Sequence, residues 1–302
     1  MYTFIDSAGK QQTAEYLEGQ LKSPGYQADR ALKVGLLPPG DPDLREARPQ
    51  SVSSLTLDDV RNHYQTTFRP DLTTIVVIGD VDSAEVRGAI EKYFGGWKAD
   101  GPTPDPTLPP VAKNMAKEFS VADPQAVQAS VTLAQEVGLN RFDPDYYALQ
   151  VGNNVLGGGF YATRLYHDLR QVAGLVYTVD DSFVAGKTRS VYTVTFGSDP
   201  PNVAKARDLV VRDLRAMQTE TVSPAELHQA KALLLRQMAL QQSSEDAIAD
   251  LLLARAQIGL PLDESRRMGQ RYYDMTADEV RAAFARWIRP QDFVQVIRAP
   301  SQ

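Results

Sequence analysis

The 302-residue sequence predicts an α+β sandwich, in which a mostly antiparallel β-sheet packs against helices. Three observations support this prediction. Short segments of alternating apolar and polar residues resemble strands, long amphipathic segments resemble helices, and one helix–turn–strand pattern occurs twice. The repeated pattern also predicts a duplicated-module architecture in which the first module is incomplete.

The repeat joins residues 55–78, "LTLDDVRNHYQTTFRPDLTTIVVI", to residues 275–298, "MTADEVRAAFARWIRPQDFVQVIR". The two segments align without a gap and share seven identical residues. In each, a threonine (Thr56 or Thr276) with an acid three residues later predicts a capped helix start. Arg-Pro then ends the helix, and a β-branched run predicts a strand. Two convergent units are the alternative to a duplicated module.

The offset between the two copies is 220 residues, which sets the expected domain organisation. If each module spans about 220 residues and the second copy ends at the C-terminus, the first copy ends near residue 100. We therefore expect residues 1–97 to be the C-terminal part of a first module, with the rest upstream. The proline-rich residues 98–112 are the expected linker, and residues 113–302 the complete second domain.

The second domain shows the alternation of strand and helix signals in most detail. Its expected strands are residues 117–122, 126–135, 175–183 and 190–197, and its expected helices are 143–156, 202–218, 223–241 and 244–258. A further amphipathic helix is expected at 83–97, ahead of the linker.

Composition excludes several classes of function. A net charge of -6 argues against nucleic acid, whose binders carry a basic surface. No apolar run reaches the roughly 18 residues that a membrane-spanning helix needs. The absence of cysteine excludes disulfides and thiolate metal sites.

Histidine and serine patterns do not indicate a catalytic centre within this chain. The three histidines, His63, His167 and His228, are not spaced as zinc ligands, and neither H-E-x-x-H nor H-x-x-E-H occurs. No G-x-S-x-G motif is present either. We therefore expect no metal ligands in this chain.

Three consecutive glycines stand out in residues 156–177, "LGGGFYATRLYHDLRQVAGLVY". A phosphate loop would need Lys-Ser/Thr after the glycines or a strand before them, so phosphate binding is the weaker interpretation. Gly157 could end a helix in a left-handed cap, with Gly158 and Gly159 permitting a tight turn. Alternatively, all three glycines let a bound peptide approach the backbone closely.

After the glycines, the sequence predicts a helix with Arg170 on its polar side, about 140° from Leu165. Gly174 is expected to end this helix, and Tyr177 to lie on the next strand. Without further context, Arg170 could be a solvated charge and Tyr177 a core or cross-strand aromatic residue. The expected apolar stripe of the helix is Tyr161, Leu165, Leu169 and Val172.

Three segments resemble the C-terminal half of the pitrilysin/insulinase family of zinc metallopeptidases: "FRPDLTTIVVIGDVDSAEVRGAIEKYFGGW", "DPDYYALQVGNNVLGGG" and "LGGGFYATRLYHDLRQVAGLVYTV". In that family the zinc motif lies in the first domain of a pair, and the second domain contributes an arginine and a tyrosine seven residues apart. Arg170 and Tyr177 match this spacing, with Gly174 between them. The resemblance implies that Tyr177 bonds the scissile carbonyl or oxyanion and Arg170 the substrate backbone.

The resemblance therefore implies a non-catalytic, peptide-binding region of a zinc metallopeptidase. Zinc would lie on an upstream domain in cis or on a catalytic subunit in trans, and peptides or unfolded polypeptides would be the substrates. An inactive structural subunit of a processing-peptidase-like complex is the alternative, and a glycine-loop phosphate binder is a third. Resemblance to bacterial members favours a periplasmic or secreted location, although residues 1–10 lack signal-peptide features. Residues 1–50 match the family least well.

Overall fold

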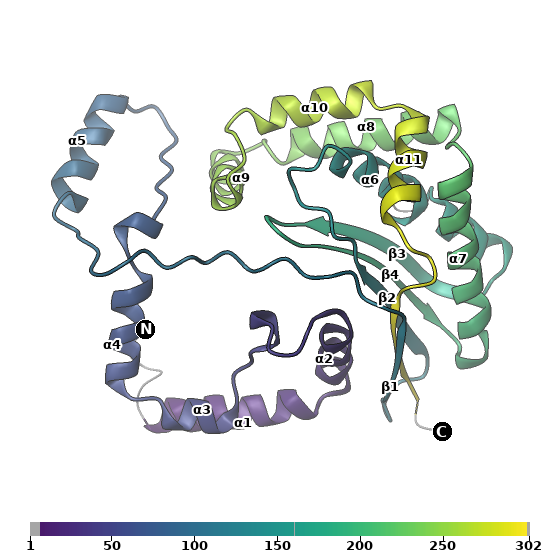
Figure 1. Cartoon of the computed structure of the whole chain (residues 1–302), viewed down its shortest axis with the longest axis horizontal. Coiled ribbons are helices and arrows are strands. Elements are labelled where there is room, and N and C mark those ends of the chain that lie inside the picture. Colours follow the sequence, from purple (N-terminus) through teal and green to yellow (C-terminus); the bar gives the residue numbers. More distant parts are fainter. Residues whose placement is uncertain (1–6, 160, 301–302) are drawn as a thin grey trace. The chain divides into compact units, whose positions relative to one another are not determined.

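The computed structural model describes residues 7–159 and 161–300 and divides them into two units (Figure 1). The sheet unit comprises Leu21–Glu46, Leu108–Met238 and the described residues from Glu264 onward. The helical unit comprises the described residues up to Gln20, together with Ala47–Thr107 and Ala239–Asp263.

The sheet unit contains a five-stranded β-sheet with the strand order β1-β5-β2-β4-β3. β1 runs parallel to β5, and the other neighbouring strands are antiparallel. The predicted α+β fold with a mostly antiparallel sheet is therefore confirmed. The strands are β1 (Lys117–Ala122), β2 (Ala129–Glu136), β3 (Val176–Ala185), β4 (Ser190–Ser198) and β5 (Val294–Ala299).

Helices cover one face of the sheet and form the main core with it (Figure 1). Val131 and Leu133 of β2 belong to the same buried cluster as Leu149 and Phe284 from this helical layer. Gly152 has no room for a side chain, because a Cβ there would lie 2.2 Å from the Phe284 ring. The helices of this layer are α6 (Tyr146–Asn153), α7 (Val203–Thr219), α8 (Pro224–Leu240), α10 (Glu264–Asp274) and α11 (Ala277–Trp287).

The opposite face of the sheet is covered only in part. Helix α2 (Pro24–Leu36) packs against β1 and β5, where Leu36, Ala134 and Val294 form a small buried cluster. It begins at Ser23, whose hydroxyl accepts a bond from the Tyr26 peptide N–H at 3.2 Å. Beyond α2, the same face of β2, β4 and β3 presents mainly short side chains to solvent, among them Ser130, Thr195, Thr178, Asp180 and Ser182.

The helical unit contains no strand among its described residues. Its apolar side chains are largely exposed, among them Tyr64, Phe68, Ile75 and Val77. Its helices are most of α1 (Ser7–Lys22), α3 (Pro49–Ser54), α4 (Leu57–Thr67), α5 (Ser83–Phe94) and α9 (Glu245–Ile258), with the short 3-10 turn η3 (Pro70–Leu72).

The two copies of the repeat agree in their helices and differ in their strands. α4 and α11 both begin with a capping box, in which the N-cap threonine and an acid three residues later bond each other's backbone N–H. Residues 293–299 then include β5, whereas residues 73–78 are extended without a strand partner. The strand expected at 73–78 is therefore wrong for this structure, because a strand forms only where a neighbouring strand accepts its hydrogen bonds.

The repeated Arg-Pro pairs have similar roles. Arg69 is buried and donates to the Asp100 carbonyl at 2.8 Å, while its guanidinium pairs with Asp71. Arg289 donates to the Glu136 carbonyl at 3.1 Å and pairs with Asp292. In each copy, the arginine after the helix fastens another segment through its backbone.

The expected linker, residues 98–112, has neither helix nor strand. The two units do not follow the predicted domain boundaries, since residues 21–46 belong to the sheet unit and 239–263 to the helical unit. The division into repeated modules at 1–97, 98–112 and 113–302 stays a prediction, because packing units and repeated modules need not coincide. In the described residues, no helix has the length and apolar character needed to cross a membrane.

Candidate functional site

The three glycines lie in a widened helical turn. α6 continues directly into the π-helical segment η4 (Asn154–Gly158), which ends at Gly159 with φ -101°. The expected left-handed cap at Gly157 is therefore wrong, because Gly157 is helical and its φ is not positive. A positive φ is found instead at Gly174 (φ 63°), which ends the following helix as predicted.

Each glycine of the turn occupies a place where another part of the chain comes close. A Cβ on Gly157 would lie 2.9 Å from Cγ of Asp181, and one on Gly158 would lie 2.4 Å from Nδ2 of Asn153. A Cβ on Gly159 would lie 2.5 Å from the Asn154 carbonyl oxygen. Packing within the chain thus accounts for all three glycines. Their predicted contact with a peptide stays a prediction.

Asp181 is the residue against which the glycine turn packs. It lies on β3, is only 3% exposed, and its Oδ2 accepts a hydrogen bond of 2.5 Å from the Tyr192 hydroxyl. Burial raises the pKa of Asp181 well above its usual range, while Tyr192 and the peptide N–H groups of Gly157 and Gly158 act in the opposite direction. The position facing the glycines is therefore already filled by a carboxyl group, which disfavours phosphate there.

The helix after the turn is wider than expected. Its π-helical segment η5 (Tyr166–Val172) ends with a bond from the Ala173 N–H to the Asp168 carbonyl, five residues back. Leu165 and Leu169 are buried as predicted, whereas the other two members of the expected stripe, Tyr161 and Val172, are exposed. The stripe is wrong at those two positions. At Val172, the cause is that i→i+5 winding turns the side chain away from the core.

Arg170 projects from η5 into solvent, as predicted. Its guanidinium carbon lies 5.2 Å from the centre of the Tyr166 ring, a cation–π arrangement. Within the described part of the chain, no carboxylate pairs with Arg170 and no hydrogen bond joins it to Tyr177. An exposed guanidinium without a carboxylate partner can donate its N–H groups to a ligand.

Tyr177 lies at an irregularity in strand β3. The register shifts between Val176 and Thr178, so that Tyr177 and Thr178 are both exposed instead of alternating. Such bulges often redirect a side chain beside a binding site. Tyr177 is 47% exposed, which excludes the alternative of a core aromatic residue.

The Tyr177 hydroxyl donates to both carboxylate oxygens of Asp199, at 3.1 and 3.2 Å. This bond raises the pKa of Tyr177, so the phenol keeps its proton. Asp199 directly follows Ser198, whose hydroxyl donates to the Leu175 carbonyl at 2.8 Å. The start of β3 and the end of β4 are thereby held together, and Asp199 is fixed beside Tyr177.

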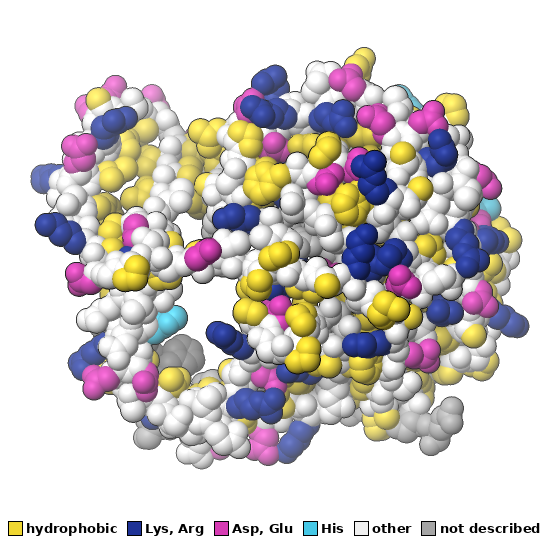
Figure 2. Space-filling model, in the orientation of Figure 1, with side chains coloured by type: hydrophobic (Ala, Val, Ile, Leu, Met, Phe, Trp, Pro, Cys, Tyr) yellow, Lys and Arg dark blue, Asp and Glu magenta, His cyan; other side chains and the backbone are white. Residues whose placement is uncertain are grey.

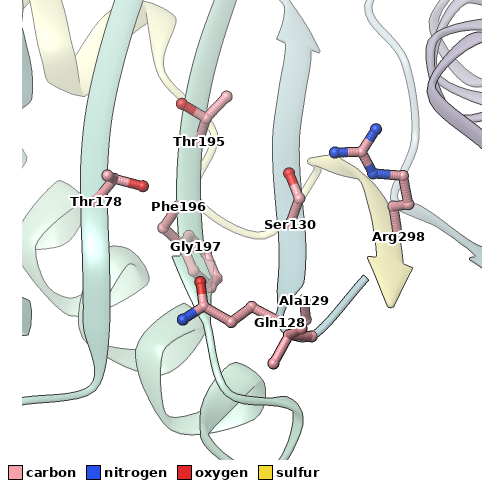
Figure 3. Close-up of a pocket in the computed structure, with 9 residues that line it drawn as sticks. Gln128, Ala129, Ser130, Thr178, Thr195, Phe196, Gly197 and Arg298 are labelled. Carbon is pink, nitrogen blue, oxygen red and sulfur yellow. The ribbon is translucent and has the colours of Figure 1, made fainter. Parts of the chain in front are cut away.

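A hollow of about 440 Å³ lies next to Tyr177 on the open face of the sheet (Figure 3). In Figure 3 the Thr178 and Thr195 hydroxyls point toward each other from neighbouring strands, and Gln128 extends across one end. Gln128 acts on the pKa of Tyr177 in the opposite direction to Asp199. The lining residues are Val127, Gln128, Ala129, Ser130, Thr178, Thr195, Phe196, Gly197 and Arg298.

The residues that the structure describes do not fit a zinc ion. In the described ranges, 7–159 and 161–300, no group of three or more His, Cys, Asp or Glu side chains could hold a metal. His167 instead lies beside the Asp168 carboxylate, at 2.6 Å, on the surface.

Sequence comparison finds relatives among proteases. The family model described as "Peptidase M16 inactive domain" matches residues 54–234. A Bacillus subtilis protein named "Probable inactive metalloprotease YmfF" is 27% identical over 220 residues, which cover 70% of this chain and 49% of that protein. The "Uncharacterized zinc protease YmxG" of the same organism is 25% identical over 185 residues, covering 60% of this chain and 43% of that protein. The chain thus spans about half the length of these curated relatives.

Solved structures share the fold. A peptidase M16 inactive domain from Pseudomonas fluorescens superposes with a TM-score of 0.85 at 24% identity, covering 97% of this chain and 69% of that one. The periplasmic protease PqqL from Escherichia coli gives a TM-score of 0.79 at 17% identity, covering 97% of this chain and 32% of that one. At these identities the likeness shows the fold alone.

Proposed function

Because the chain belongs to the family of peptidase M16 inactive domains, we propose that it is the peptide-binding, non-catalytic region of a zinc metallopeptidase. Zinc would be held by an upstream domain in cis or by a catalytic subunit in trans. Relatives named zinc proteases support this, as does the lack of a metal-binding group among the described residues here.

The single observation that carries the proposal is the exposure of Tyr177 at the bulge of β3, beside the hollow. A phenol has one proton to donate, and here that proton is directed to Asp199. A neutral peptide carbonyl is a weaker acceptor than a carboxylate, whereas the oxyanion that forms during amide hydrolysis carries a comparable charge. Tyr177 would therefore exchange Asp199 for substrate mainly as the oxyanion develops, which stabilises the transition state.

Arg170 would bind the substrate in its ground state. Its guanidinium is exposed and has no carboxylate partner in the described residues, so it can donate to peptide carbonyls without first breaking an ion pair. The two residues thus have separable roles. Arg170→Ala should weaken peptide binding as well as rate, while Tyr177 should act on rate alone.

The test is Tyr177→Phe in the complete zinc-containing enzyme. The substitution removes one hydroxyl and keeps the ring, so kcat should fall roughly ten- to a thousand-fold, with little change in KM or in unfolding temperature. Tyr273→Phe is the matched control, because Tyr273 is also exposed but lies on α10. An unchanged kcat in Tyr177→Phe would refute the assigned role.

The helical unit supplies a surface for the proposed zinc domain or subunit. Figure 2 shows hydrophobic side chains gathered over the region of α5 and the extended residues before it. Such a cluster of exposed apolar side chains is unusual on the surface of a soluble protein and is typical of a contact with another domain. The exposed apolar residues here are Tyr64, Phe68, Leu72, Ile75, Val77, Ile78, Val81, Tyr93, Phe94 and Trp97.

A second candidate function is an inactive subunit that supports a separate catalytic partner. The name of the Bacillus subtilis relative, a probable inactive metalloprotease, favours it. An H-x-x-E-H motif in the same polypeptide would support the first proposal, and its absence the second. We also propose a periplasmic or secreted location, which the resemblance to bacterial members of the family favours. Fractionation of cells that produce the full-length protein tests this.

A further inference from the structure

The open part of the sheet has an unusual surface for a solvent-facing sheet. Beyond the part that α2 covers, the exposed positions of three neighbouring strands carry Ser130 on β2, Thr195 on β4, and Thr178 and Asp180 on β3, with Asp180 opposite Thr195 in the strand register. These side chains are short, so the surface is hollowed and not covered by long charged groups (Figure 3). At about 440 Å³, the hollow lies within the range of small-ligand sites.

The chemistry of this surface suits a polypeptide backbone. Each hydroxyl can donate one hydrogen bond and accept two, so Ser130, Thr178 and Thr195 can bond both the N–H and the C=O groups of an extended chain. Gln128, at the end of the hollow, offers a further donor and acceptor. Most of the lining side chains are short, so the hollow would accept many sequences.

One side of the hollow carries a positive charge. Among its described lining residues, Arg298 is the only charged one. In Figure 3 its guanidinium extends from β5 toward β2, close to the position of Ser130. Its Nε lies 3.7 Å from Oδ2 of Asp123, a long ion pair, and its side chain is 38% exposed. This geometry leaves the terminal N–H groups able to bind a second carboxylate.

We propose that the hollow binds an extended segment of unfolded polypeptide that carries an acidic side chain, which pairs with Arg298. The inference rests on the proposed function, because a segment bound there would run beside Tyr177, the sequence neighbour of the lining residue Thr178. Hydroxyls would then supply affinity for the backbone, and Arg298 a preference for acidic side chains.

The experiment measures equilibrium binding to the chain itself by fluorescence anisotropy. The probes are two labelled, unstructured nine-residue peptides that differ only in a central Glu or Gln. Arg298→Gln should weaken binding of the Glu peptide about tenfold and that of the Gln peptide less than twofold. Arg236→Gln, which changes an exposed arginine on α8, should alter neither.

A second variant tests the hydroxyl surface separately. Thr195→Val keeps the branched shape and removes one hydroxyl, so both peptides should bind a few-fold more weakly while their ratio stays constant. Thermal unfolding of each variant identifies any loss of folding. Failure of both peptides to bind, or an unchanged Glu/Gln ratio in Arg298→Gln, would overturn the inference.

The outcome is distinguishable from a failure of the proposed function. Tyr177→Phe should leave the equilibrium binding of both peptides within about twofold, because the phenol acts on the transition state. If peptides do not bind in the hollow and Tyr177→Phe still lowers kcat in the complete enzyme, only the inference about the hollow is lost. If the peptides bind as expected and kcat is unchanged, only the role of Tyr177 is lost.

Discussion

Glu136 makes the stability of the sheet unit depend on pH. This carboxyl lies at the end of β2 and is 2% exposed. The nearby Arg189 is engaged elsewhere, since it donates to both oxygens of Asp41 at 2.9 Å and also to Asp43. Burial therefore raises the pKa of Glu136 to about 7; Asp41 and Asp43 add to this, while Arg189 and Arg289 oppose it.

The sign and size of the effect follow from the shift. In the unfolded chain Glu136 has its ordinary pKa of 4.5, so between pH 4.5 and 7 the folded state holds a proton that the unfolded state has lost. The free energy of unfolding therefore falls as pH rises through this window, and the loss is complete above pH 7. At about 1.4 kcal/mol per pKa unit, the penalty approaches about 3 kcal/mol.

Glu136→Gln removes this penalty, because an amide does not ionise. The variant's advantage in unfolding free energy over the unchanged protein should be about 2 to 3 kcal/mol larger at pH 8 than at pH 5. Urea titrations at pH 5, 6.5 and 8, followed by intrinsic fluorescence, measure the difference. Glu118→Gln, on the exposed side of β1, should show no such trend. A difference that is constant with pH, or that falls as pH rises, would refute the reasoning.

Two further substitutions test the packing that positions the site. Gly157→Ala should cost about 1 to 3 kcal/mol of stability, because its Cβ would meet Asp181 within 3 Å, whereas Gly88→Ala, with open space around it in α5, should be neutral or slightly stabilising by thermal unfolding. Arg141→Met should lower the free energy of unfolding by about 3 to 5 kcal/mol, because it leaves the buried Glu264 without its 2.5 Å partner. Adding Glu264→Leu to this variant should restore much of the lost stability. A double variant that is no more stable than Arg141→Met would contradict the pairing.

Much of the fold follows from local sequence signals. Alternation predicted β1 to β4 within a few residues, capping threonines predicted the starts of α4 and α11, and α8 begins close to the start of the helix expected at 223–241. The Ser223–Glu226 capping box is formed, with Glu226 accepting from the Ser223 N–H at 2.7 Å. The family resemblance is likewise confirmed by the matching model of the M16 inactive domain. These features depend on neighbours in sequence, which is why they could be predicted.

The missed features depend on contacts between distant residues. α10 has few apolar residues, and its first residue, Glu264, is held by Arg141 and by the Tyr147 hydroxyl at 2.9 Å. No local pattern indicates that pairing. In α2, by contrast, a signal was present, because Ser23 followed by proline is a usual helix start. Residues 73–78 have a strand composition, but composition does not supply a strand partner.

The candidate site likewise contains residues that could be predicted from the sequence and partners that depend on distant contacts. The resemblance to the family pointed to Arg170 and Tyr177, while Asp199 and Asp181, which hold the surrounding structure, were not predicted. Asp199 is 22 residues from Tyr177 in sequence, and the Tyr192 hydroxyl reaches Asp181 across neighbouring strands. A solvated surface charge with no role in binding would occupy the same exposed position as Arg170. Its role in binding substrate is therefore a proposal, which peptide binding by Arg170→Ala decides.

The glycine triplet is best explained through Asp181. Gly157 and Gly158 pack against this residue, which is four positions after Tyr177 on β3. The same turn leads into the helix that carries Arg170, and the Leu175 N–H bonds the Leu169 carbonyl at 2.9 Å to bring that helix back to the strand. A side chain at Gly157 would push the turn from β3 and shift the start of the helix relative to Tyr177. The glycines therefore serve the site by fixing the distance between two segments, and this role requires no contact between the glycines and a ligand.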